Sequence, residues 1–135
     1  MTNEELAAFA TRAMDNAYVP YSGYRVGAAL LTKSGKIYTG CNIENAAYSP
    51  TVCAERTAIF KAVSEGEREF VKIAVAGGKN GEILGEFPPC GVCRQVMAEF
   101  CGGDFEILVV NGENSFTVYK LSDILPYSFN PEHIK

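Results

Sequence analysis

The 135-residue chain has no tryptophan, a single histidine and no long hydrophobic run. Its longest apolar stretch, Val26 to Leu31, contains a glycine and two alanines and is far shorter than the ~20 residues that cross a bilayer. The first residues, Met1-Thr2-Asn3-Glu4-Glu5, are polar and acidic, whereas a secretory signal begins with basic residues followed by apolar ones. We therefore expect a cytoplasmic protein with no membrane partner.

Basic residues are also scarce and scattered. Twelve Lys and Arg stand against 16 Asp and Glu, for a net charge of −4. A polynucleotide-binding protein needs a basic stripe that contacts phosphates, and none is present. A nucleic-acid polymer is therefore excluded as a partner, and an uncharged nucleoside suits this surface better than a nucleotide.

The five cysteines do not form an even set. An odd number without a signal peptide argues against a secreted disulfide framework. Reduced thiols are expected instead, with some of them bound to a metal. The cysteines are Cys41, Cys53, Cys90, Cys93 and Cys101.

Hydrophobic periodicity predicts alternating helices and strands in one domain, residues 1–135. A capping box formed by Thr2 and Glu5 starts a helix that is expected to run to Tyr18. The later elements are predicted as strands at 26–32 and 36–42, a helix at 53–64 closed by Gly66, a strand at 70–76, a helix at 91–100, strands at 105–110 and 116–120, and a helical turn at 122–125 capped by Ser122. This order favours an α/β fold of three layers, α/β/α, in which a mixed five-stranded sheet has helices on both faces.

The strongest local motif is Pro89-Cys90-Gly-Val-Cys93, at the start of a predicted helix. A Cys-x-x-Cys pair can chelate a metal or act as a redox couple, but the order of elements does not match a thioredoxin. Cys53, at another helix start, adds a third thiolate. Three ligands with an open fourth position are typical of catalytic zinc.

Other side chains leave a structural site open as an alternative. Cys41 and Cys101 look like core thiols, yet either could be the fourth ligand of a purely structural zinc. His133, in a polar tail, is expected to be solvated.

Two charged residues follow Cys53 directly. Glu55 lies close to the metal without being a ligand, so it can shuttle protons; the alternative is an ordinary solvated helix glutamate. Arg56 lies on the same helical face as Cys53 and can offset the excess charge of three thiolates. Arg94, beside Cys93, is a second candidate for this role or an ordinary surface arginine.

Together the motifs resemble the small homotetrameric zinc-dependent cytidine deaminases. The resemblance covers nearly the whole chain and is carried by Val26-Gly-Ala-Ala-Leu-Leu, Gly40-Cys-Asn-Ile-Glu-Asn-Ala-Ala-Tyr48, Cys53-Ala-Glu-Arg-Thr-Ala and Pro89-Cys-Gly-Val-Cys-Arg-Gln95. The zinc deaminases use either His or Cys as the first ligand and a Glu that is not a ligand. The resemblance implies that Cys53, Cys90 and Cys93 hold Zn²⁺, that Glu55 shuttles protons and that Arg56 neutralises the site.

The resemblance also implies the substrate contacts. Asn42 and Glu44 would bind the ribose 3′-hydroxyl, and residues two apart on an extended strand end do point the same way. The backbone around Ala54 would contact the base. Tyr48 would wall the pocket of a neighbouring subunit, and Phe129 would close over the pyrimidine from another subunit. Tyr24 matches a position where the family has a phenyl ring.

The expected reaction is zinc-dependent hydrolytic deamination of cytidine and deoxycytidine to uridine and deoxyuridine, with release of ammonia, in pyrimidine salvage. A nearer alternative is a deaminase of another aminopyrimidine nucleoside, such as a blasticidin-type antibiotic. A more distant one is a non-enzymatic structural zinc or redox domain built on the Cys90–Cys93 pair.

Overall fold

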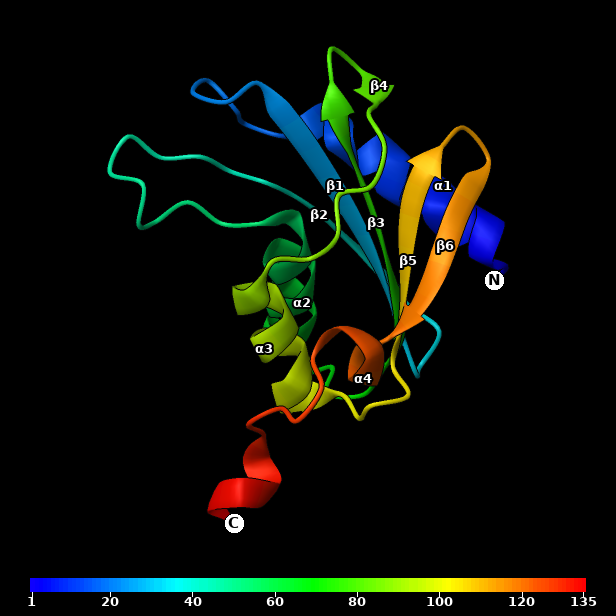
Figure 1. The fold of residues 1–135 in the computed structure, drawn as a ribbon, viewed down its shortest axis with the longest axis vertical. Helices are drawn as coiled ribbons and strands as arrows, with labels where there is room; N and C mark the ends of the chain where they lie inside the picture. Colours follow the sequence, from blue (N-terminus) through cyan, green and yellow to red (C-terminus); the bar gives the residue numbers. More distant parts are fainter.

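A mixed sheet lies at the centre of the computed structural model, which describes residues 1–135 (Figure 1). Its main strands run in the order β2-β1-β3-β5-β6, and β4 pairs only with β3. Neighbouring strands are antiparallel except β3 and β5, which are parallel. The bounds are β1 Tyr24–Thr32, β2 Ile37–Cys41, β3 Phe70–Lys79, β4 Glu82–Ile83, β5 Glu106–Gly112 and β6 Ser115–Lys120. The five predicted strands are all present, and β4 is an additional short one.

Helices cover both faces of the sheet, as predicted. α1 (Asn3–Ala13) packs on one face, and α2 (Ala54–Ser64) and α3 (Gly91–Phe100) lie on the other (Figure 1). The core is accordingly split into two clusters: Leu6 of α1 belongs to a cluster of 9 residues, whereas Ile59 and Met97 belong to one of 16. Shorter elements are the 3₁₀ helices η1 (Met14–Asn16) and η2 (Pro131–Ile134) and the α-helical turn α4 (Leu121–Ile124). No helix of the chain has the length and apolarity that crossing a bilayer would require.

The first helix starts as predicted but ends early. Its capping box is present: the Glu5 amide donates to Thr2 Oγ1, and the Thr2 amide donates to Glu5 Oε1. The predicted end at Tyr18 is wrong, because α1 ends at Ala13 and a single 3₁₀ turn follows. The reason lies on the neighbouring strand, where the Arg25 guanidinium donates to the backbone carbonyls of Met14, Asp15 and Ala17.

Two further boundaries differ from the prediction. The last helical turn begins at Leu121, and the cap is the Lys120 amide, which donates to Asp123 Oδ2 at 3.1 Å. Ser122, the predicted cap, lies inside the turn and its amide donates to the Gly103 carbonyl. The strand predicted at 70–76 continues to Lys79, where a tight turn starts the β3–β4 pairing.

One glycine brings α2 close to the sheet. A Cβ on Gly40 of β2 would lie 2.5 Å from the carbonyl oxygen of Ala54 and 2.5 Å from the amide nitrogen of Ala58. These separations are too short for any larger residue unless the helix moves. At the other end of α2, Gly66 follows the C-cap Glu65 with a φ of +99°, which confirms the predicted C′ glycine.

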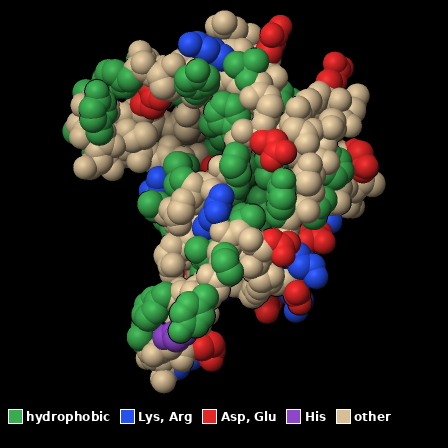
Figure 2. All heavy atoms as spheres, in the orientation of Figure 1, with side chains coloured by type: hydrophobic (Ala, Val, Ile, Leu, Met, Phe, Trp, Pro, Cys, Tyr) green, Lys and Arg blue, Asp and Glu red, His purple; other side chains and the backbone are tan.

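Two segments project from the body of the protein. Residues 43–52, between β2 and α2, form a long loop on one side, and the C-terminal residues extend away at the other end (Figure 1). The only histidine, His133, lies at this projecting end beside hydrophobic side chains (Figure 2). Its ring stacks on Phe129, with 5.4 Å between the ring centroids.

Candidate metal centre and active site

Three cysteines meet where α2 and α3 begin. Cys53 is the N-cap of α2, Cys90 is the N-cap of α3, and Cys93 lies in the first turn of α3. Their Sγ atoms all lie within 4.8 Å of one another, and those of Cys53 and Cys90 are 3.6 Å apart. Sulfurs held tetrahedrally about 2.3 Å from zinc are separated by about 3.8 Å. The three thiols therefore fit a Zn²⁺ ion.

The cluster is buried on one side and open on the other. Cys93 is fully buried, Cys53 is partly buried and Cys90 is exposed. No other cysteine, histidine or carboxylate joins the three, so neither Cys41 nor Cys101 acts as a fourth ligand. An open position, as in catalytic zinc sites, remains for water or a substrate.

The charges around the thiols favour a metal-binding form. Arg56 Nη2 donates to Cys53 Sγ at 3.4 Å, and Arg56 Nε is buried without a hydrogen-bond partner. Hydrogen bonding to Cys93 lowers the pKa of Cys53 to about 5, with the Arg56 guanidinium acting in the same direction against desolvation. The same bond and burial raise the pKa of Cys93. Zinc binds the thiolate form, so a metal ion at this site would displace the thiol protons.

The carboxylate predicted to shuttle protons is buried beside the cluster. Glu55, in the first turn of α2, is only 3% exposed, so it is not the ordinary solvated glutamate of the alternative. Burial raises the pKa of Glu55 to about 7, the Cys53 thiolate adds to this effect, and the Glu55 amide and Arg56 oppose it. A cation on the neighbouring thiolates would favour the ionised form.

Asn42 contacts the first residues of β1, and Glu44 contacts the segment that leads into this strand. Asn42 Oδ1 accepts from the Val26 amide at 2.8 Å, and Asn42 Nδ2 donates to the Tyr24 carbonyl at 2.9 Å. Glu44 Oε1 accepts from the Tyr21 and Ser22 amides, and Oε2 accepts from the Ser22 hydroxyl. The two residues therefore position the start of β1 and the turn before it, as well as being candidate ribose ligands.

Three other residues predicted to contact the substrate lie on three separate segments: α2, the 43–52 loop and the C-terminal residues. Ala54, the first residue of α2, is fully buried, so only its backbone is available to a ligand. Tyr48 is 75% exposed on the projecting loop and has a φ of +64°. With Tyr21, Glu44 and others it lines a hollow of about 360 Å³. Phe129 lies between α4 and η2 and is largely exposed.

One aromatic side chain was missed from the sequence. The Phe87 ring lies 6.0 Å from that of Tyr24, between ring centroids, and a Cβ on Gly77 would lie 2.3 Å from Phe87 Cγ. Phe87 directly precedes the Pro-Pro-Cys90 segment. An aromatic residue so close in sequence to a predicted zinc ligand could have indicated a contact near the site. Lys79 Nζ lies 5.0 Å from the centroid of the Tyr24 ring.

Arg94 does not contact the thiols through any hydrogen bond. Its Nε donates to the Pro89 carbonyl at 2.8 Å, and its Nη1 donates to the Ile124 carbonyl at 2.7 Å. The side chain is part-buried, so it is neither a partner of the sulfurs nor an ordinary surface arginine. Cys41 and Cys101 are also part-buried.

The chain is similar to known deaminases in both sequence and structure. The family model for the cytidine and deoxycytidylate deaminase zinc-binding region matches residues 1–109. A cytidine deaminase of Sporosarcina psychrophila is 48% identical over 134 residues, covering 99% of this chain and 96% of that protein. The crystal structure of cytidine deaminase from Burkholderia pseudomallei matches with a TM-score of 0.87 and 44% identity, covering 96% of this chain and 100% of that one. A blasticidin-S deaminase of Bacillus cereus is 32% identical over 129 residues, covering 93% of this chain and 90% of that protein.

Proposed function

The chain belongs to the cytidine and deoxycytidylate deaminase family, and we propose that it hydrolyses the 4-amino group of cytidine and deoxycytidine, with Zn²⁺ as its cofactor. The products are uridine or deoxyuridine and ammonia. The observation that carries this function is the convergence of three thiols beside the buried carboxylate of Glu55. A structural zinc site has no use for such a carboxylate and would fill all four coordination positions.

The chain's own residues account for the proton transfers. Zn²⁺ held by Cys53, Cys90 and Cys93 would supply Lewis acidity, which lowers the pKa of water from about 15.7 towards neutrality. Glu55 accepts the proton that this water loses and donates one to N3 of the pyrimidine, so that C4 becomes electrophilic. The hydroxide adds to C4, and Glu55 then carries the remaining proton of this hydroxyl group to the 4-amino group, which leaves as ammonia while the C4 carbonyl forms. The Arg56 guanidinium offsets part of the negative charge of three thiolates, which would otherwise oppose ionisation of the water.

The ribose is proposed to bind at Asn42 and Glu44. Each has hydrogen-bonding capacity beyond its contacts within the chain: the Asn42 amide has a second N–H, and the Glu44 carboxylate has a further lone pair. A donor and an acceptor together match one hydroxyl group. The 3′-hydroxyl is common to ribose and deoxyribose, so both nucleosides are proposed substrates. The backbone of Ala54 and the ring of Tyr24 are proposed to contact the base.

We further propose that four copies assemble and share their active sites. Tyr48 and Phe129 lie on projecting segments and are 75% and 59% exposed. Tyr127 and Ile134, near Phe129, are exposed as well. Apolar side chains gathered in this way are typical of an interface. In the assembly, Tyr48 and Phe129 reach the pockets of neighbouring subunits, and light scattering should give four times the chain mass of 14.6 kDa.

We also propose a single-domain organisation and a cytoplasmic location. Residues 1–135 act as one deaminase domain. The five free cysteines suit the reducing cytoplasm, where deamination of cytidine would serve pyrimidine salvage.

The test is a direct assay of the purified, zinc-loaded protein. Ultraviolet absorbance should show conversion of cytidine and deoxycytidine to their uracil counterparts, and prior treatment with a chelator should abolish it. Conversion of neither nucleoside by folded, zinc-replete protein would refute the proposal. Free cytosine is the matched control for the ribose contact.

A blasticidin-type substrate is the second candidate, because the Bacillus cereus blasticidin-S deaminase is a relative at 32% identity. The higher identity to a cytidine deaminase, 48%, favours the ordinary nucleosides. A non-enzymatic redox role for the Cys90–Cys93 pair would not explain why Glu55 is buried beside the three thiols. Faster turnover of blasticidin S than of cytidine would decide for the second candidate.

A further inference from the structure

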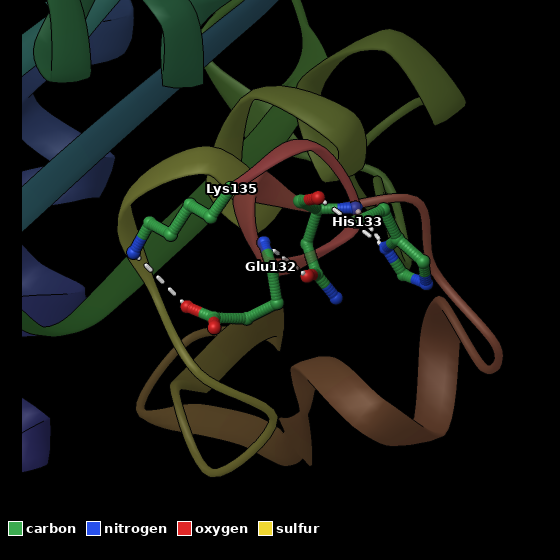
Figure 3. Close-up of polar contacts among 4 residues, drawn as sticks. Glu132, His133 and Lys135 are labelled. Atoms are coloured by element: carbon green, nitrogen blue, oxygen red, sulfur yellow. Dashed lines mark hydrogen bonds and ion pairs between the residues drawn. The ribbon is translucent and has the colours of Figure 1, made fainter.

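Few hydrogen bonds attach the C-terminal residues to the rest of the protein. The contacts at the very end are local: Lys135 Nζ pairs with Glu132 Oε1 at 3.0 Å, the Asn130 amide donates to His133 Nδ1, and the Glu132 amide donates to Asn130 Oδ1 (Figure 3). These bonds shape the tail, defined as residues 124–135, but do not anchor it.

Burial anchors only the first two residues of the tail. A hollow of about 570 Å³ lies between the C-terminal end of α3 and the tail. Tyr127 is fully exposed, and Phe129 is 59% exposed. Of the tail residues, only Ile124 and Leu125 pack against the main hydrophobic cluster.

The anchoring comes from two adjacent residues of α3. Arg94 Nη1 donates to the Ile124 carbonyl at 2.7 Å, and Gln95 Nε2 donates to the Phe129 carbonyl at 2.7 Å. These two are the only side-chain hydrogen bonds that join residues 124–135 to any part of the chain before residue 121. The tail is therefore fixed to the helix that carries Cys93.

Arg94 has a second contact at the metal centre. Its Nε donates to the Pro89 carbonyl at 2.8 Å, and Pro89 directly precedes the ligand Cys90. The guanidinium is planar and presents its N–H groups in fixed directions, so one side chain fixes the Pro89 and Ile124 carbonyls relative to each other. Pro89 is fully buried, which leaves its carbonyl little alternative to this donor.

We propose that Arg94 is a positioning residue that ties the metal-binding turn Pro89–Cys93 to the C-terminal tail, with Gln95 extending the same attachment to Phe129. Through these bonds the zinc ligands of one subunit are held in a fixed position relative to Phe129, the ring proposed to close over the substrate of a neighbouring subunit. The role rests on the proposed function, because the tail matters to turnover only if Phe129 reaches a pyrimidine. It depends on the geometry of the guanidinium and not on its charge.

Substitutions at Arg94 and Gln95 separate the effects of the guanidinium geometry, of its charge and of the bond to Phe129. Arg94→Lys keeps the charge but cannot hold both carbonyls in one plane, and Arg94→Gln removes the charge as well. Gln95→Ala breaks only the bond to Phe129. Arg68→Gln is the matched control, since the Arg68 guanidinium also donates to two backbone carbonyls, those of Val63 in the last turn of α2 and of Glu67.

Three measurements on the full-length, zinc-loaded protein test the proposal. Release of Zn²⁺ to a chromogenic chelator should be about 10-fold faster in both Arg94 variants, the lower end of what loss of an outer contact costs. Amide hydrogen exchange over residues 124–130 should accelerate in these variants and in Gln95→Ala. In Gln95→Ala, KM should rise while zinc release and kcat per bound zinc stay near wild type. Arg68→Gln should change none of these.

Several results would overturn the proposal. The proposal fails if Arg94→Lys releases zinc and exchanges its tail amides at the wild-type rates. It also fails if Arg94→Gln is defective and Arg94→Lys is not, because the positive charge alone would then explain the role of Arg94. If the wild-type protein deaminates no cytidine, the proposed function fails, but zinc release and tail exchange still decide the role of Arg94. If Arg94→Gln does not fold, the comparison of Arg94→Lys with Arg68→Gln decides it.

Discussion

Arg56 Nη2 donates to Cys53 Sγ across 3.4 Å, within one turn of the same helix. The positive group therefore lies against the ligand whose pKa is most strongly lowered. Three thiolates and one Zn²⁺ carry a net negative charge, and this guanidinium opposes it. We therefore expect Arg56→Gln to release zinc about 10- to 100-fold faster than wild type.

Zinc release to a chromogenic chelator measures this effect. Arg12→Gln is the control, because Arg12 contacts the Phe9 ring on α1 and no cysteine. Equal release rates in Arg56→Gln and wild type would show that the hydrogen bond to Cys53 does not stabilise the bound metal.

Glu55→Gln should keep the fold and the zinc but lose turnover. The substitution preserves the size of a side chain that is 3% exposed, yet the amide cannot accept and return a proton. General acid–base catalysis contributes about 10²- to 10⁴-fold, so kcat should fall by about this factor. Zinc stoichiometry and thermal melting should match wild type, and Glu99→Gln, an exposed position on α3, should retain full activity. A kcat within a few-fold of wild type would exclude Glu55 as the proton shuttle.

Removing zinc should destabilise the protein. A ligand present at 1,000 times its Kd stabilises the native state by about 4 kcal/mol, so the Tm should drop by several degrees on chelation. The number of thiols that react with a disulfide reagent should increase at the same time, because three of the five free cysteines are freed. Added Zn²⁺ should reverse both changes, whereas Mg²⁺, which prefers oxygen ligands, should reverse neither. An unchanged melting curve would contradict a metal centre at these cysteines.

Mutating either ribose candidate should weaken nucleoside binding and lower stability, because both residues hold the chain around the start of β1. Glu44→Gln weakens a charge-assisted contact worth about 1.5–3 kcal/mol, so KM for cytidine should rise about 10-fold or more with a smaller change in kcat. Asn42→Ala should raise KM too, and it should also lower the free energy of unfolding, because it leaves the Val26 amide and the Tyr24 carbonyl without their partner. Steady-state kinetics and urea unfolding separate these effects. The ribose assignment is wrong if free cytosine reacts with wild-type protein as well as cytidine does.

The contact between Ser22 and Glu44 should make stability depend on pH. The Ser22 hydroxyl holds the pKa of Glu44 below its usual range, desolvation opposes it, and the Tyr21 and Ser22 amides add to the lowering. A lowered folded pKa means that the bond stabilises the fold above the ordinary glutamate value, about 4.3, and that this stabilisation is lost as pH falls through the folded pKa.

The stability difference between wild type and Ser22→Ala should accordingly be larger at pH 7 than at pH 3. Urea unfolding at the two pH values measures it. Ser64→Ala is the control, because the Ser64 hydroxyl donates to the Lys61 carbonyl, which does not titrate. A difference that is the same at both pH values would mean that Ser22 does not act on the ionised carboxylate.

The sequence was most informative where the chemistry is local. Cys-x-x-Cys at a helix start and Glu two residues after Cys53 are short-range features, and the structure places these residues at the starts of α3 and α2. Short apolar runs and the turn residues between them likewise predicted the five main strands. Both kinds of inference need only the preferences of neighbouring residues.

Contacts across the fold could not be predicted in this way. The early end of α1 is imposed by Arg25 from β1, and the two backbone partners of Asn42 lie 16 and 18 positions away. Arg94 stood beside a ligand in the sequence, but its actual partner, the Ile124 carbonyl, lies 30 positions further along. Phe87 meets Tyr24 only because β3 and β1 are paired. Each of these depends on the sheet order, which periodicity does not specify.

The one parallel pair in the sheet, β3 with β5, has a consequence for folding kinetics. The connection between these strands contains α3 and therefore Cys90 and Cys93. A parallel pair needs a long crossover, and closing a long loop costs entropy before its contacts form. We therefore expect the Cys90–Cys93 pair to reach Cys53 late in folding. Zinc should then slow unfolding more than it accelerates folding. The metal would therefore stabilise the native state kinetically, with little effect on the rate at which the chain reaches it.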